Sequence, residues 1–191
     1  MKILLVAAIL LVQPSFAQNH STFYFSRFGW SLELPSDFKL VSSNTTESIK
    51  ESGQELLEKS SCKTINRSDV VELITAAKDT MSFINANYNI SKKITSENWL
   101  EANRQVKATI LISYIKQLSY TPKIKSHNIF IDGVKFDEFS VDFDLDQGQV
   151  YHLVYLATFI KGHYFTITYS YTDAATGIEI REVLNGSKFK K

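Results

Sequence analysis

The hydrophobic pattern is strongest between Val150 and Thr172, where two strands are predicted around a turn at Lys161-Gly162. β-branched and aromatic residues dominate both segments, and glycine is suited to the tight turn between them. The first segment is apolar at both its even and its odd positions, so both of its faces must be covered. It is therefore expected to be an interior strand of a sheet that has a layer on each side.

Shorter alternating patterns extend this sheet in both directions along the chain. The Asp132-Gly133 pair between two strand patterns is a strong hairpin signal, and short turns between consecutive strands make the sheet antiparallel. Residues 70–77 are rich in β-branched side chains, which favours a strand, although a helix stays open as the alternative. Further strands are predicted at 30–34, 81–90, 124–131 and 134–145, and residues 187–189 are expected to return to the sheet edge.

Three segments have the pattern of helices. The strongest, 96–120, has Ser96 as its expected N-cap, a wide apolar stripe at helical spacing, and Pro122 after its end. A helix at 44–59 is predicted from Asn44 and Glu47 in capping-box spacing. A closing helix at 174–184 is expected after Asp173, with its apolar residues facing inward: Ile178, Ile180, Val183 and Leu184.

The N-terminal residues have the pattern of a secretory signal peptide. Lys2 is followed by an apolar run, then Pro14 and small residues that predict cleavage after Ala17. The run is shorter than the roughly 20 apolar residues of a membrane-spanning helix, and no later stretch reaches that length. We therefore expect an exported protein, periplasmic or extracellular, consisting of a signal peptide at 1–17 and a single domain at 18–191.

Composition narrows the classes of function. The formal net charge is +1, and cleavage that removes Lys2 would make it 1 − 1 = 0, which disfavours nucleic acid as a partner. A hydrophobic content of 44% indicates a folded domain with a real core. Cys62 is the only cysteine, so no internal disulfide can form, and its role stays open between a buried apolar group and a reactive thiol.

Both ends of the expected domain resemble a known family. Residues 29–38, Gly-Trp-Ser-Leu-Glu-Leu-Pro-Ser-Asp-Phe, resemble the opening of Mog1/PsbP-like domains, and the strand at 164–171, the closing helix and residues 183–189 resemble their ending. The resemblance implies an α+β fold, an antiparallel β-sheet flanked by helices on both faces (an α/β/α sandwich). Members of the family include photosystem accessory proteins, a small-GTPase binder and exported bacterial proteins, and none of their functional residues can be matched here.

Few residues are arranged for chemistry. Asp142, Asp144 and Asp146 alternate along one strand and could recruit a cation, although they do not follow the spacing of an EF-hand loop and fit a solvated strand face. The histidines, His20, His127, His152 and His163, have no metal-site spacing. His152 and His163 lie in paired strands across the central turn and could be neighbours, but two histidines make no complete metal site. No nucleophile motif or phosphate-binding loop is present.

These observations predict a non-catalytic exported accessory protein without a cofactor or metal. We expect it to bind a protein partner through a sheet edge or an exposed aromatic surface such as Tyr169 and Tyr171. Two alternatives stay open: a carrier that holds a small apolar ligand between sheet and helix, and a hydrolase whose site is assembled from distant residues.

Overall fold

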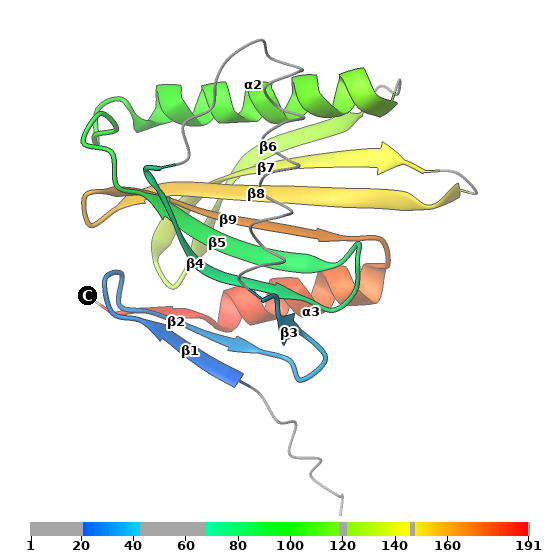
Figure 1. Ribbon diagram of the computed structural model, residues 1–191, viewed down its shortest axis with the longest axis horizontal. Coiled ribbons are helices and arrows are strands. Elements are labelled where there is room, and N and C mark those ends of the chain that lie inside the picture. The colour runs from blue at the N-terminus through cyan, green and yellow to red at the C-terminus, as the bar shows by residue number, and fades with distance from the viewer. Residues whose placement is uncertain (1–20, 43–67, 119–121, 146–147, 191) are drawn as a thin grey trace, which may run out of the picture.

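The computed structural model of the chain describes residues 21–42, 68–118, 122–145 and 148–190. Within these ranges the fold is mostly β, with two antiparallel sheets and two helices, α2 (Trp99–Leu118) and α3 (Ala174–Gly186) (Figure 1). The larger sheet has seven strands in the order β3-β4-β5-β9-β8-β7-β6, and the smaller has three in the order β1-β2-β10. The strands are β1 Ser21–Phe25, β2 Trp30–Leu34, β3 Lys39–Leu40, β4 Val70–Ala77, β5 Phe83–Asn89, β6 Lys123–Ile131, β7 Val134–Asp144, β8 Val150–Ile160, β9 His163–Tyr171 and β10 Lys188–Phe189.

Two tight turns fix the register of the larger sheet. Asp132-Gly133 joins β6 to β7 with φ values of 48° and 81°, and Lys161-Gly162 joins β8 to β9 with φ values of 49° and 80°. Positive φ at both central residues is typical of the two-residue hairpin turn whose twist matches that of the strands. The hairpins predicted around these two turns are therefore confirmed. Residues 70–77 also form a strand, β4, which pairs with β5 and decides against the helix alternative.

The central strand β8 is covered on both faces, as its sequence predicts. It lies between β9 and β7. Leu153, Tyr155 and Ala157 belong to an apolar cluster under α2, whereas Val154 and Leu156 belong to the cluster on the opposite side. Because side chains alternate along a strand, a sheet with two apolar faces needs two covering layers.

The predicted α/β/α sandwich is wrong, because helical layers do not flank both faces of the sheet. One face carries α2, which packs through Trp99, Val106, Ile110 and Leu111. The opposite face is covered largely by the three-stranded sheet, and α3 lies beside that sheet against β9 (Figure 1). The sequence requires a cover on each face, but it does not require that the cover be helical.

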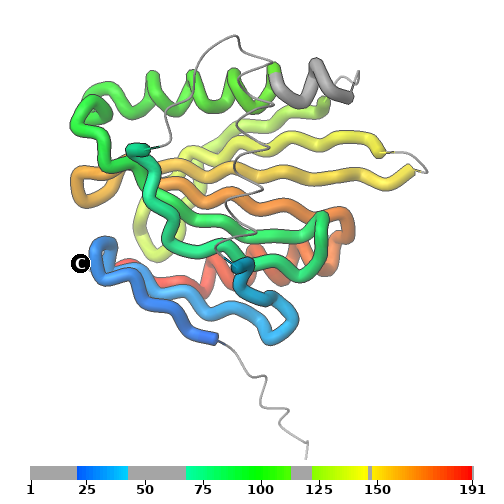
Figure 2. Tube along the Cα trace, viewed as in Figure 1, coloured from blue at the N-terminus to red at the C-terminus, as the bar shows by residue number. Residues whose placement is uncertain are grey.

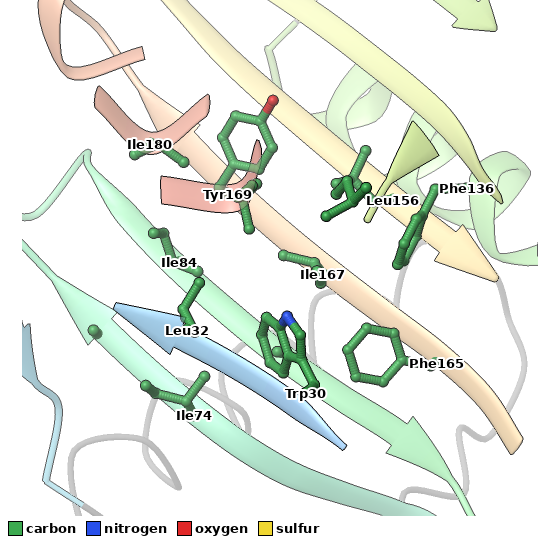
Figure 3. Packing of buried hydrophobic residues seen from close by; sticks show 14 of the residues in the cluster. Trp30, Leu32, Ile74, Ile84, Phe136, Leu156, Phe165, Ile167, Tyr169 and Ile180 are labelled. Carbon is green, nitrogen blue, oxygen red and sulfur yellow. The ribbon is translucent and has the colours of Figure 1, made fainter. Parts of the chain in front are cut away.

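The larger of the two cores lies between the two sheets. Trp30 and Leu32 of β2 are buried against Phe165 and Ile167 of β9, and Ile180 of α3 closes one end of the cluster (Figure 3). Each fully buried side chain of this kind contributes about 1.5–3 kcal/mol of transfer free energy. Burial of this core is what holds the small sheet on the large one.

The two ends of the described chain meet in the small sheet. β10 pairs with β2 so that Phe189 lies opposite Trp30, and the last strand runs beside the first hairpin (Figure 2). The predicted return of residues 187–189 to a sheet edge is thus confirmed, although the sheet is the smaller one. The Asp132 carboxylate accepts the backbone N–H of Phe189 at 2.7 Å, and this bond is the first cause of its lowered pKa. The β6–β7 turn is thereby tied to the small sheet.

The helices differ from their predictions in detail. α2 begins at Trp99 instead of near Ser96, because residues 95–98 form a turn in which the Asn98 side chain accepts the Thr95 backbone N–H at 2.8 Å. α3 begins after Asp173 as predicted, and the Asp173 carboxylate accepts the N–H groups of the first turn. Ile178 was expected to face inward but is 61% exposed. The helix predicted at 44–59 lies outside the described residues.

Candidate functional site

The outer edge of β6 is the most exposed β-structure of the large sheet. β6 has β7 on one side, and the sheet order within the described residues places no strand on the other. Its first six residues, 123–128, are all exposed, and so is Phe130. An edge strand of nine residues presents a long row of backbone N–H and C=O groups to which another chain can add.

The opposite edge of the described sheet is formed by β3 and by the part of β4 that β3 leaves unpaired, since β3 pairs only with Ala76 and Ala77. β3 comprises only Lys39 and Leu40, and very short edge strands are one of the ways in which proteins prevent edge-to-edge pairing. Only Val70 of β4 is exposed, whereas residues 123–128 of β6 are all exposed. Among the described residues, the β6 edge is therefore the one that offers a long, exposed strand of the kind used in β-addition.

The side chains of β6 give its two faces different chemistry. Lys123, Lys125 and His127 lie opposite Asp142, Ser140 and Glu138 of β7, on the α3 side of the sheet. Ile124 and Phe130 lie on the α2 side and are 47% and 66% exposed. The edge is thus basic on one face and partly apolar on the other.

A second feature is an open cleft of about 440 Å³ between α3 and the ends of β8 and β9. The strands contribute His152 and Tyr171, whose rings stack with centroids 4.6 Å apart. The α3 wall is formed by Ala174, Gly177, Ile178, Arg181 and Glu182. Gly177 is required there, because a Cβ at this position would lie 2.5 Å from Cε2 of the Tyr171 ring.

The imidazole of His152 is held by a carboxylate. Its Nδ1 lies 2.7 Å from Oδ1 of Asp142 on the neighbouring strand. Because an ionised carboxylate only accepts hydrogen bonds, Nδ1 carries the proton and Nε2 is the nitrogen left for another partner. This pairing gives His152 a fixed ring orientation at the cleft.

Arg181 is held by a buried carboxylate beside the same cleft. Its guanidinium donates to both oxygens of Glu138, at 2.6 and 3.0 Å, and lies over the Tyr169 ring at 5.5 Å. Burial is the largest effect and lowers the pKa of Arg181, but the hydrogen bonds to Glu138 together with the electrostatic effects of Glu138, Tyr169 and Tyr171 outweigh it, and the net shift of the pKa is upward. The Arg181 charge is therefore already neutralised within the fold.

The aspartates of β7 do not gather around a common point. Asp142 contacts His152, and Asp144 lies 4.0 Å from Lys123, whereas Asp146 lies outside the described residues. In the described part of the chain, no group of three or more His, Cys, Asp or Glu side chains could hold a metal ion. The solvated-face interpretation fits Asp144, while Asp142 has a specific partner.

The histidines are separated by the hairpin. His163 lies opposite Ile160 beside the turn, whereas His152 lies opposite Tyr171 at the far end, so the two histidines are not neighbours. His163 instead contacts Arg27 and the backbone carbonyl of Asn89. His20 and Cys62 fall outside the described residues.

The exposed aromatic surface predicted at Tyr169 and Tyr171 is also wrong. Tyr169 is 1% exposed, and burial is the first cause of its raised pKa. Tyr171 is partly buried between His152 and α3. Of the two surfaces predicted for a partner, the sheet edge is the one that the structure leaves accessible.

The layer between α2 and the sheet is occupied by side chains where it is described. The Tyr164 hydroxyl donates to Oδ1 of Asn103 at 2.9 Å and therefore accepts the proton of Tyr155 at 2.7 Å. Asn103 and Lys107 both donate to Oδ2 of Asp137, at 2.6 and 2.7 Å. This chain of hydrogen bonds lies where a carrier would hold its apolar ligand, and it weighs against that alternative.

Two of these arrangements had a signal in the sequence. A hairpin centred on position 147 places residue 142 opposite residue 152, so the Asp142–His152 pair follows from the turn alone. The signal for Glu138 is less direct. It is a charged residue on a strand that also carries Phe136 and Phe139, and a charge in such a strand indicates that it has a buried partner. Its partner Arg181 comes from a distant helix, and no spacing rule connects them.

No protein-family model and no curated protein matches the chain. A crystal structure from Bacteroides thetaiotaomicron aligns with a TM-score of 0.48 and 10% sequence identity, over 89% of this chain and 48% of that chain. The chain thus spans about half the length of that protein, and a likeness at this level supports no conclusion about fold or function. The resemblance to Mog1/PsbP-like domains stays a prediction.

No helix among the described residues has the length and apolar character needed to cross a bilayer.

Proposed function

We propose that this chain is an exported, non-catalytic interaction protein that binds an extended segment of a protein partner along the outer edge of β6. Export rests on the signal-peptide pattern of residues 1–17. The observation that carries the binding proposal is the nine-residue exposed edge strand at the end of a seven-stranded sheet. In β-addition, backbone hydrogen bonds supply affinity and alternate side chains supply specificity.

The chemistry of the two faces of β6 defines the partner. A strand added to β6 places alternate side chains beside Lys123 and Lys125 on one face and beside Ile124 and Phe130 on the other. Opposite charges on neighbouring strands stabilise the pairing by about 0.2–1 kcal/mol per pair. The preferred segment therefore alternates acidic residues with apolar, β-branched ones.

The hydrolase alternative has less support. His152 and Asp142 touch in a cleft, which is the arrangement that such an enzyme would need. Among the described residues, however, Asp142 is the hydrogen-bond partner of His152, and no hydroxyl or thiol nucleophile is bonded to its ring.

The test uses the full mature chain and a nine-residue peptide of alternating Glu and Val, with peptide affinity measured by fluorescence anisotropy. The peptide with Lys in place of Glu is expected to bind at least about tenfold more weakly. A version with alternate backbone amides methylated keeps the charge but loses the ladder hydrogen bonds, and it should not bind. Amide hydrogen exchange should slow at β6 when the unmodified peptide is added.

Two charge-reversal variants distinguish binding at the β6 edge from a non-specific electrostatic attraction between the peptide and the protein. Lys125→Glu is expected to weaken binding up to about fivefold, because it places like charges on adjacent strands. Lys92→Glu makes the same change at an exposed position away from the edge and should leave the affinity unchanged. Equal effects of the two variants, or full binding by the methylated peptide, would refute β-addition at this edge.

A further inference from the structure

The cleft beside α3 is separate from the β6 edge. We infer that it binds a small organic ammonium ion with an apolar body, which donates a hydrogen bond to His152 Nε2. The inference joins three properties of the cleft: the acceptor presented by His152, the sign of the charge around it, and the apolar surface of its walls.

The acceptor follows from the His152–Asp142 contact. Asp142 occupies Nδ1 at 2.7 Å, so the neutral imidazole has its lone pair on Nε2. His152 is itself part of the cleft lining, and stacking on Tyr171 restricts the motion of its ring. A ligand that matches this nitrogen must carry an N–H or O–H donor.

The charge around the cleft selects among donors. Arg181 is paired with Glu138 through two hydrogen bonds, so these two charges cancel. Asp142 and Glu182 then leave the site with an excess of negative charge. Carboxylates at the cleft favour a cation and disfavour an anion. An ammonium group is the hydrogen-bond donor that matches both the lone pair of His152 Nε2 and the negative charge around the cleft.

The walls specify the remainder of the ligand. Ala174 and the 61% exposed Ile178 offer aliphatic surface on the α3 side, and the His152–Tyr171 stack offers aromatic edges on the other. A volume of about 440 Å³ is within the range of pockets that bind small molecules. The site thus fits a primary amine with a compact aromatic or aliphatic body.

The experiment is an NMR titration of the histidine side chains in the full mature chain at about pH 8, where an amine probe is cationic. The probes are benzylamine, benzyl alcohol and benzoate, which share a ring and differ in charge. Benzylamine should produce a saturable shift of the His152 resonances, with affinity at least about tenfold above that of benzoate. Equal or tighter binding of benzoate would overturn the inference, and so would the lack of a saturable shift with benzylamine.

Three variants locate the site. His152→Gln should weaken benzylamine binding about tenfold, the usual effect of losing a hydrogen bond to a charged group. Glu182→Gln changes an exposed residue that does not hold the fold together, and it should weaken binding about threefold. His163→Gln is the matched control and should have no effect. His163 lies on β9, at the other end of the β8–β9 hairpin from His152. Unchanged binding in Glu182→Gln, or equal losses in the two histidine variants, would refute the assignment.

Discussion

The buried ion pair between Arg181 and Glu138 offers the sharpest test of how α3 is held on the large sheet. The Glu138 side chain is 5% exposed and the Arg181 side chain 33%, and the two form the bidentate contact described above. Arg181→Met keeps the length and much of the volume of the side chain but leaves the Glu138 carboxylate buried without its main partner. Removing one member of a buried pair costs about 3–5 kcal/mol.

The expected loss lies at the lower end of that range. Because a third of the Arg181 side chain is exposed, water can reach part of the site and compensate the remaining charge. His127 Nε2 also lies 3.6 Å from Oε1 of Glu138 and offers partial compensation. We therefore expect Arg181→Met to lower the free energy of unfolding by about 2–3 kcal/mol at neutral pH. Urea denaturation followed by circular dichroism measures this loss as a shift of the midpoint at constant slope.

Two comparisons distinguish an uncompensated charge from lost packing. The double variant Arg181→Met/Glu138→Met removes both charges and should recover to within about 1 kcal/mol of the parent protein. Arg104→Met is the control, since Arg104 pairs with Glu101 on the exposed side of α2 and should cost less than about 0.5 kcal/mol.

The reasoning fails under either of two results. A double variant that stays as unstable as the single variant would mean that packing, and not charge, carries the effect. A double variant that loses as much as the two single variants together would mean that the two residues act independently.

Two further predictions concern packing and pH. Gly177→Ala places a methyl group against the Tyr171 ring and should destabilise the protein by about 1–3 kcal/mol. Gly186→Ala is the control and should cost nothing, because its Cβ would meet nothing within 4 Å. Thermal unfolding of the two variants measures the difference. Burial raises the pKa of both Tyr155 and Tyr164. The stability that these tyrosines contribute is therefore complete below about pH 10, where unfolded tyrosine titrates, and is lost as the pH rises toward the folded-state values. Near-ultraviolet absorbance should show them ionising only together with alkaline unfolding, and earlier ionisation would contradict their burial.

The β-hairpins could be predicted from sequence because their determinants are local. The turns at Asp132-Gly133 and Lys161-Gly162 need positive φ at two successive residues, and the sequence supplies a suitable pair at each. Once a turn is placed, the register of its two strands follows by counting. In the same way, the connection between β7 and β8 places residue 142 opposite residue 152. The β-branched residues of segment 70–77 favoured a strand but left a helix open, and the pairing of β4 with β5 decides for the strand.

The faces of α3 could not be predicted with the same accuracy. Ile178 and Ile180 are two residues apart and point about 200° away from each other on a helix, so both cannot face the core. Apolar character alone does not choose between them. The structure buries Ile180 and exposes Ile178, and it places Gly177 where the Tyr171 ring needs space. That choice depends on a ring from β9, which is a tertiary contact.

The cover of the second sheet face depends on tertiary structure in a similar way. Two-sided burial of β8 requires material on each face, and a helix or a small sheet satisfies that requirement equally well. Residues 30–34 alternate Trp, Ser, Leu, Glu and Leu, a pattern that predicts a strand with one buried face. What the pattern leaves open is whether this strand joins the large sheet or packs on it. The Mog1/PsbP-like resemblance favoured helices on both faces, and the structure places a second sheet on one of them.

The proposed function depends on the strand order of the large sheet. The amino-acid composition of each strand indicates its place in that order, whereas the turns between consecutive strands do not. Interior strands such as β8 are apolar on both faces, whereas β6 reads Lys-Ile-Lys-Ser-His-Asn-Ile-Phe-Ile and is polar over most of its length. A strand with lysines and few buried positions is tolerated at an edge and not between two neighbours. The polar character of residues 123–128 thus points to an edge before any coordinates are known. An edge protected only by lysines rejects another basic edge but accepts an acidic strand, and this asymmetry is why charge reversal in the peptide is the decisive comparison.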